Sequence, residues 1–192
     1  SPKIIAVTNS AGETTNYTAD NIVISTGARP RQLKIHGLPD ERYMTNIELF
    51  DTETAPKHLV IGGAGVIALE MAFAFQKLGT KVTIFALDKR ALMTAIPEAA
   101  EAIQASLDRK GITSVYGATA KSFSEATQTL TLVQGETEIS INDVDKVLMA
   151  IGRVRNIDSL GLEQAGVKFD PRIGVLVNSF GETNIKGVYA IG

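Results

Sequence analysis

The chain has 192 residues, 44% of them apolar, and its 19 basic and 21 acidic side chains leave a formal charge of −2. This composition suits one globular domain of ordinary size with attachments. A charge so close to zero, without a run of like charges, argues against nucleic acid as a partner. The longest apolar stretch, Leu59 to Phe75, contains three glycines and a carboxylate, so no membrane partner or membrane span is expected.

Cysteine is absent, which excludes a thiol nucleophile, a disulfide framework and a cysteine-ligated metal, and no metal site is predicted. His36 and His58 have no nucleophile or ligand pattern beside them and are expected in a loop and at the start of a strand. No segment resembles a secretory signal, so the cytoplasm is the expected location. The chain begins Ser-Pro without methionine and is interpreted as a piece of a longer enzyme.

The first third of the chain predicts short strands and a connection. Runs rich in β-forming residues at 4–7 and 22–25 flank a polar stretch with glycine, which is the pattern of a hairpin or meander. Residues 31–57 are mixed, with several turn signals and a possible helical turn near 46–50. They are interpreted as a connection between two domains.

Strand and helix patterns alternate between residues 59 and 116. The first helix closes at a C-terminal glycine, and the second begins with a proline at its first position. The predicted order is a strand at 59–61, a helix at 66–78, a strand at 81–85, a helix at 97–110 and a strand at 112–116. This order predicts an α/β fold of the Rossmann type, a parallel sheet with covering helices.

Beyond residue 120 the apolar period changes to the two-residue period of strands. The runs at 121–124, 129–133 and 138–141 predict a small antiparallel meander, and 146–150 predicts a buried strand. The segment that follows has turn clusters with strand candidates at 175–178 and 187–191.

One motif carries chemistry. The run Gly63-Ala64-Gly65-Val66-Ile67-Ala68 matches the dinucleotide fingerprint, and it follows a strand and opens a helix as the mechanism requires. Gly63 permits the tight turn, Gly65 lets the backbone approach a pyrophosphate, and Ala68 allows close packing of the helix. The amides and dipole at the helix start attract phosphate. The motif predicts a pyridine dinucleotide as ligand; a glycine-rich turn that only joins a strand to a helix is the alternative.

The choice between NAD and NADP depends on the end of the second strand. About 20 residues after the fingerprint, an acidic residue would receive the ribose hydroxyls of NAD. Ala86 occupies that place, and Lys89 with Arg90 could supply positive charge to a 2′-phosphate. Asp88 argues for NAD, and a solvated loop is the ordinary role of isolated basic residues. These residues favour NADP but leave both cofactors open.

Taken together, several segments resemble the flavoprotein pyridine nucleotide-disulfide oxidoreductases, a family that includes glutathione reductase, dihydrolipoamide dehydrogenase, mercuric reductase and NADH oxidases. Residues 19–30 resemble the strand that leads from the flavin domain into the nucleotide domain. Residues 56–70 resemble the fingerprint with its following glutamate. Residues 150–153 resemble the second crossing, and 183–192 resemble a strand that ends in Gly-Asp in the family.

The resemblance implies a domain organisation. Residues 1–30 and 154–192 would be partial FAD-domain segments rich in strands, and residues 31–153 would be the NAD(P)-binding domain. Gly152 would approach the nicotinamide half through its backbone, and Glu70 would pair with a lysine near the flavin that lies outside this chain. The sequence departs from the family at Ala68, at Ala86 and at Val154-Arg155.

The resemblance also implies a reaction, in which hydride passes from reduced nicotinamide to FAD and then to a disulfide. The full-length enzyme would bind FAD and form a homodimer. This chain alone, without cysteine or a second fingerprint, is expected to be inactive and to need the remainder of its own flavoenzyme. Two alternatives stay open: a non-catalytic NAD-binding regulatory module, and a flavoprotein oxidase or ferredoxin-reductase type of enzyme without a redox disulfide.

Overall fold

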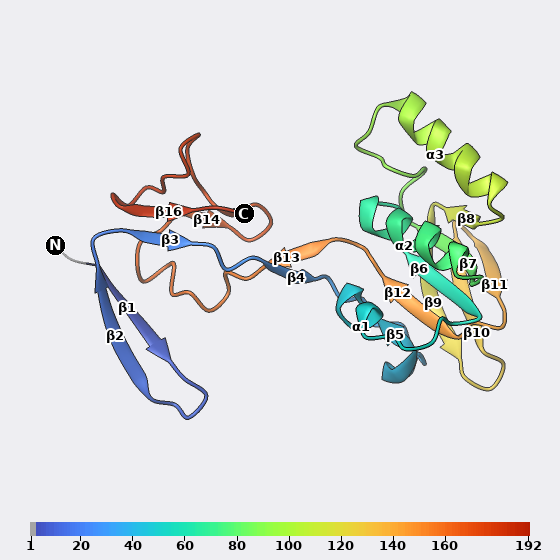
Figure 1. Ribbon diagram of the computed structural model, residues 1–192, viewed down its shortest axis with the longest axis horizontal. Coiled ribbons are helices and arrows are strands. Elements are labelled where there is room, and N and C mark those ends of the chain that lie inside the picture. The colour runs from blue at the N-terminus through green and yellow to red at the C-terminus, as the bar shows by residue number, and fades with distance from the viewer. Residues whose placement is uncertain (1–2) are drawn as a thin grey trace. The chain divides into compact units, whose positions relative to one another are not determined.

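The computed structural model describes residues 3–192 (Figure 1). Ser1 and Pro2, which belong to the expected segment 1–30, lie outside the described residues. The described residues divide into an outer unit, residues 3–29 and 154–192, and an inner unit, Pro30–Arg153. The cofactor that each unit serves stays a prediction.

The inner unit is built on a parallel sheet with the strand order β5-β12-β6-β7-β8. Its strands are β5 (Tyr43–Met44), β12 (Lys146–Met149), β6 (His58–Gly62), β7 (Lys81–Ala86) and β8 (Thr113–Tyr116). Neighbouring strands pair in parallel throughout this order. The predicted α/β fold is confirmed. Strand β5 lies in the stretch 31–57, where the sequence predicts a connection; its two residues are too few to show a strand period.

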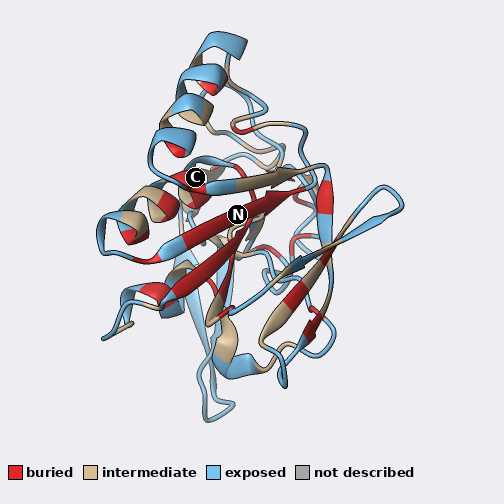
Figure 2. Ribbon diagram, turned by 90° about the vertical axis from the view of Figure 1, so that its right-hand side faces the viewer, coloured by how far each residue is buried: buried red, intermediate tan, exposed pale blue. Residues whose placement is uncertain are grey.

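Helices cover one face of this sheet and the antiparallel meander covers the other. The helices are α2 (Val66–Lys77) and α3 (Pro97–Arg109), and the meander comprises β9 (Ala118–Ser124), β10 (Thr129–Gln134) and β11 (Thr137–Ile141). Leu59 and Ile61 pack in the helix-side core, whereas Val60 packs in the meander-side core. Burial on both faces explains why β6 is a continuous apolar run, and Figure 2 shows the buried strands at the centre of the sheet in red.

The helix ends follow from the sequence signals. Gly65 is the N-cap of α2, and Gly79 follows its C-cap with a positive φ of 87° that favours glycine. Pro97 stands at the start of α3, where its missing N–H leaves no hydrogen bond unmade. The short helix α1 (Asn46–Phe50), which follows the 3₁₀ helix η1 (Asp40–Arg42), begins with a capping box between Thr45 and Glu48.

The outer unit contains short strands, and their pairing differs from the expected pattern. Strand β1 (Lys3–Thr8) pairs antiparallel with β2 (Thr14–Ala19), while β3 (Ile22–Ile24) pairs parallel with β16 (Val188–Ala190). The sequence of β2 is TTNYTA, which is largely polar and exposed, so it carries no apolar signal. The run at 22–25 contains a strand, as expected, but this strand pairs with β16 and not with β1.

The remaining strands of the outer unit are brief. Strand β14 (Phe169–Asp170) pairs with β15 (Gly174–Val175), and β4 (Ala28–Pro30) pairs with β13 (Arg153–Arg155). The strand predicted at 175–178 is thus much shorter and starts one residue earlier. The side-chain oxygen of Asn178 accepts hydrogen bonds from the backbone of Phe180 and Glu182, which makes a turn there. A small core gathers Ile157, Leu162, Val167 and Val188.

Candidate functional site

A cavity of about 660 Å³ opens in the inner unit at the carboxyl ends of β6, β7 and β12. In open parallel sheets this edge is where ligands bind, because the turns that leave the strands meet there. The lining residues are Arg31, Leu33, Gly63, Ala64, Gly65, Val66, Ile67, Phe85, Ala86, Leu87, Asp88, Ala118, Thr119, Ala150, Ile151 and Gly152. The cavity therefore includes the first five fingerprint residues, Ala86 and Gly152.

Two glycines of the fingerprint have different reasons to be glycine. Gly63 has a φ of 116°, and a Cβ added there would lie 2.4 Å from the carbonyl oxygen of Ala150. Gly65 has a φ of −84°, which any residue adopts, and a Cβ added there would meet nothing within 4 Å. The fold itself therefore requires glycine at position 63, but it makes no such demand at position 65.

Backbone hydrogen bonds fix the turn around the cavity. The N–H of Gly63 donates to the carbonyl of Phe85 at 2.8 Å, and the N–H of Ala150 donates to Gly62 at 2.7 Å. The N–H of Arg31 donates to the carbonyl of Gly152 at 2.9 Å. Gly152 itself has a φ of 106° and open space where a Cβ would stand. Backbone hydrogen bonds therefore hold the cavity floor together, and Gly65 and Gly152 leave open space beside it.

Several predicted site residues lie outside this cavity. Ala68 is fully buried in the helix-side core, which matches its expected packing task. Glu70 is exposed on α2 and does not line the cavity, so the carboxylate on this apolar helix is solvated rather than buried. Lys89 and Arg90 line a second hollow, also of about 660 Å³, between α3 and β8. The sequence predicts that both residues lie beside Ala86 at the nucleotide site. In the structure they line this separate hollow instead.

Sequence reasoning missed part of the cavity wall. Arg31 supplies a cation among the lining residues, and Leu33 and Leu87 supply apolar surface. Leu87 is 78% exposed, unusual for a leucine, at the point where β7 ends. Arg31 and Leu33 belong to the stretch interpreted as a connection, where no motif marks them. A hydrogen bond from Arg31 to the second crossing, which a single sequence does not reveal, brings this stretch to the cavity.

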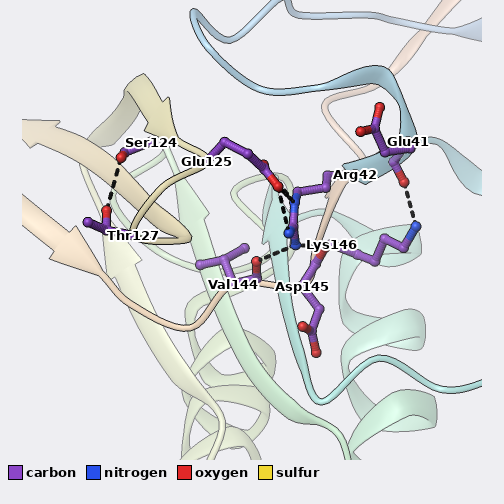
Figure 3. Close-up of polar contacts among 8 residues, drawn as sticks. All are labelled: Glu41, Arg42, Ser124, Glu125, Thr127, Val144, Asp145 and Lys146. Atoms are coloured by element: carbon purple, nitrogen blue, oxygen red, sulfur yellow. Dashed lines mark hydrogen bonds and ion pairs between the residues drawn. The ribbon is translucent and has the colours of Figure 1, made fainter.

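The opposite end of the same sheet is closed by polar side chains. Asp145 accepts hydrogen bonds from the backbone N–H groups of Lys57 and His58 at 2.6 and 3.1 Å. Arg42 donates to the carbonyls of Val144 and Asp145 at 3.1 and 3.0 Å, and it forms a bidentate ion pair with Glu125 (Figure 3). These contacts join η1, the meander and the start of β12.

His58 is buried at this closed end. Its Nδ1 lies 3.0 Å from the carbonyl oxygen of Asn142, which can only accept, so Nδ1 carries the proton. Its Nε2 then accepts from the hydroxyl of Thr83 at 3.0 Å. Burial lowers the pKa of His58 below its ordinary value, which favours the neutral ring. The structure thus gives His58 a structural place at the start of β6, distant in the strand from the fingerprint.

Two features bear on other classes of site. Among residues 3–192, no helix has the length and apolar character needed to cross a bilayer. The same described residues hold no cluster of three or more histidine or carboxylate side chains that could bind a metal ion.

Comparison with known sequences points to one family. A family model described as pyridine nucleotide-disulphide oxidoreductase matches residues 2–192. A mercuric reductase from Lysinibacillus sphaericus is 34% identical over 177 residues, which are 91% of this chain and 32% of the relative. A dihydrolipoyl dehydrogenase from Thermus scotoductus is 34% identical over 185 residues, which are 94% of this chain and 40% of the relative.

Comparison with solved structures agrees. LpdA from Mycobacterium tuberculosis aligns with a TM-score of 0.84 and 30% identity, over 97% of this chain and 40% of that chain. The Cu(II) complex of RclA, an HOCl-induced flavoprotein disulfide reductase from Escherichia coli, aligns with a TM-score of 0.84 and 26% identity, over 98% and 42%. The chain spans from 32% to 42% of the length of these proteins. Since the family model covers nearly every residue, this chain belongs to the pyridine nucleotide-disulphide oxidoreductase family.

Proposed function

We propose that the inner unit binds a pyridine dinucleotide, with the pyrophosphate on the turn from Gly63 to Ala68. The observation that carries this proposal is Gly65. Its backbone conformation suits any residue, and no protein atom occupies the space in front of it. A glycine that only served the turn would show a positive φ or a clash, as Gly63 does. The free space at Gly65 is what a ligand phosphate needs for close approach to the backbone.

The chemistry of the turn suits an anion. The first N–H groups of α2 have no partner within the helix, and the helix dipole places partial positive charge at the same end. Val66 and Ile67, the first two residues of α2, line the cavity, so the start of the helix lies at its wall. Arg31 is the one basic residue among those that line the cavity. A diphosphate can therefore be held by backbone donors with one arginine nearby.

The nicotinamide half would reach the other side of the cavity. Gly152 has open space above it and lines the wall with Ile151, so we assign the approach of the nicotinamide to this segment. In the parent enzyme this cavity would hold the nicotinamide from which hydride reaches FAD, and the two electrons would then pass from the flavin to reduce a disulfide to two thiols. The residues of this chain position the dinucleotide for that step. Glu70, exposed on α2, is the candidate partner for a lysine near the flavin.

Ala86, Asp88 and Lys89 decide between NAD and NADP in this proposal. Ala86 and Asp88 line the cavity, whereas Lys89 is exposed and lines the hollow beside α3. Ala86 presents no carboxylate to a 2′-phosphate, which favours NADP, while the carboxylate of Asp88 favours the ribose hydroxyls of NAD. We keep NADP as the proposed preference because position 86, at the end of β7, is the standard place for ribose recognition.

Calorimetric titration with NADH and NADPH tests the proposal. The 192-residue chain is expected to bind at least one of them at millimolar or lower concentration. The variant Gly65→Val keeps an allowed backbone conformation but fills the phosphate space, so it should abolish binding while the thermal melt stays cooperative. Thr127→Val, in an exposed turn of the meander, is the matched control and should bind normally. Unchanged affinity in Gly65→Val would place the phosphates elsewhere.

We further propose that binding and catalysis separate in this chain. The sequence contains no cysteine and one dinucleotide fingerprint, so a second site for FAD and a redox disulfide must come from elsewhere in the parent enzyme. The purified chain should be colourless and should not oxidise NADH or NADPH above background with added FAD and a disulfide acceptor. Stoichiometric bound flavin, or nicotinamide oxidation that follows the protein through purification, would contradict this.

A further inference from the structure

Arg90 directs its guanidinium at its own loop rather than at the fingerprint cavity. Its Nη2 donates to the carbonyl of Ala95 at 2.9 Å and to that of Met93 at 3.3 Å. Its Nη1 donates to the carbonyls of Ala91 and Leu92 at 3.4 and 3.3 Å. The side chain is half-buried, and both of its terminal nitrogens have partners within residues 91–95. Arg90 therefore holds this loop in a compact turn.

The turn contains a backbone conformation that needs such support. Leu92 has a φ of 48°, in the left-handed region that residues with a Cβ rarely adopt. The N–H of Ala95 donates to the carbonyl of Leu92 at 2.8 Å, which closes the turn. Because the left-handed conformation is unfavourable for leucine, it persists only where the surroundings determine it. The guanidinium of Arg90, which contacts the carbonyls on both sides of Leu92, is the group placed to do this.

The same turn contacts the fingerprint. The N–H of Leu92 donates to the carbonyl of Ala64 at 3.0 Å. In a trans peptide the carbonyl and the following N–H point in opposite directions. Fixing the Ala64 carbonyl toward Leu92 therefore directs the N–H of Gly65 to the other side of that peptide. Ala91 and Leu92 also pack in the hydrophobic cluster that contains Ala64, so the loop and the fingerprint form one packed body.

We infer that Arg90 is a positioning residue for the phosphate-binding turn and not a ligand of the 2′-phosphate. It acts through residues 91–95, which orient the Ala64–Gly65 peptide. This inference rests on the proposed nucleotide site and adds the group that sets its geometry. Its consequence is specific: Arg90 serves NADH and NADPH equally, since both carry the same pyrophosphate and the 2′-phosphate is not involved.

Titration of Arg90→Met with both nucleotides tests this consequence. The affinities for NADH and NADPH should fall together, by about fivefold or more, while their ratio stays within about twofold of the wild-type ratio. Lys110→Met removes an exposed charge at the C-terminal end of α3 and should leave both affinities unchanged. A selective loss of NADPH affinity, or no loss of either, would overturn the inference. A wild-type chain that binds neither nucleotide would instead overturn the proposed function first.

Amide hydrogen exchange supplies a readout that needs no nucleotide. The amide of Leu92 should be protected in the wild type and exchange about tenfold faster or more in Arg90→Met. The amide of Val60, in the buried centre of β6, should stay protected and show that the fold is intact. Arg90→Lys, whose ammonium cannot span the same carbonyls, should give an intermediate result. Equal protection of Leu92 in wild type and Arg90→Met would show that the loop does not depend on this side chain.

Discussion

The two ends of the inner parallel sheet differ in the residues that cover them. At the carboxyl end, β6, β7 and β12 open into a cavity with glycine and alanine at its floor. At the amino end, Arg42, His58 and Asp145 close the sheet with hydrogen bonds to backbone groups. Small residues leave space at one end, and satisfied polar side chains fill the other.

This difference separates the ligand site from the stability of the unit. Backbone donors that face a cavity are available to a ligand, whereas donors and acceptors that pair inside the protein stabilise the fold. Substitutions at the amino end should therefore change the free energy of unfolding and leave nucleotide affinity alone. Substitutions in the open space of the carboxyl end should lower nucleotide affinity and leave the free energy of unfolding nearly unchanged. Gly63 is the exception, because the fold itself requires glycine there.

The largest effect is expected from Gly63→Ala. The new Cβ would lie 2.4 Å from the Ala150 carbonyl oxygen at a φ of 116°, so both overlap and backbone strain oppose it. We expect a loss of about 3–5 kcal/mol in the free energy of unfolding, measured by urea denaturation. Gly65→Ala, the same chemical change two residues away, should lose no more than about 1 kcal/mol. Equal losses would mean that the two glycines do not have separate tasks.

Arg42→Met should destabilise the closed end next. The side chain is 17% exposed and contacts the carbonyls of Val144 and Asp145 in addition to Glu125. Its loss should cost about 2–3 kcal/mol, because hydrogen bonds from a charged group are removed from half-buried carbonyls. Lys121→Met is the matched control, since its exposed ion pair with Glu138 should contribute under about 1 kcal/mol. A change in nucleotide affinity in Arg42→Met would break the separation of the two ends.

Ala86→Glu should shift cofactor preference at the open end. A carboxylate at the end of β7 would accept hydrogen bonds from ribose hydroxyls and repel a 2′-phosphate, by about 1–3 kcal/mol. The ratio of NADPH to NADH affinity, measured by titration, should fall. Ala86 is 4% exposed, so a thermal melt must first show that the longer side chain is accommodated in the cavity. A ratio that does not fall in a folded variant would show that position 86 does not face the adenosine ribose.

The smallest effect concerns pH and His58. Burial lowers the pKa of this histidine in the fold, so between its folded and unfolded values the unfolded chain binds more protons. The free energy of unfolding should then rise with pH in that window. The contribution is complete above about pH 6.5 and is lost as the pH falls below it, by at most about 1.4 kcal/mol per pH unit. His58→Gln should show a shallower slope; identical slopes would mean that His58 does not titrate on unfolding.

Much of the inner unit could be predicted from sequence, because its signals are local. The apolar run of β6, the glycine turn and the capped helices α2 and α3 are written in consecutive residues. The fingerprint located the cavity for the same reason. Strand β2 could not be found, since polar residues form it, and β3 could not be paired, since its partner β16 is more than 160 residues away.

The positions of two arginines could not be inferred from their places in the sequence. Arg90 follows the end of β7 closely in sequence, but its guanidinium turns to the carbonyls of its own loop. Arg31 is far from the fingerprint in sequence, yet it lines the cavity. Distance along the chain does not predict where either arginine lies, because the position of each depends on turns that a single sequence does not define. Ala86 and Asp88, at the end of β7, do line the cavity, as their places in the sequence indicate.

The most direct test of the difference between the two ends is a titration of the ¹⁵N-labelled chain with NADH or NADPH, followed by amide chemical shifts. Saturating nucleotide should shift the amides of Gly65, Val66 and Gly152 most strongly. The amides of His58 and Asp145, at the closed end, should stay unchanged. Shifts that instead concentrate at the closed end, or around the hollow between α3 and β8, would contradict the assignment of the nucleotide site to the carboxyl end of the sheet.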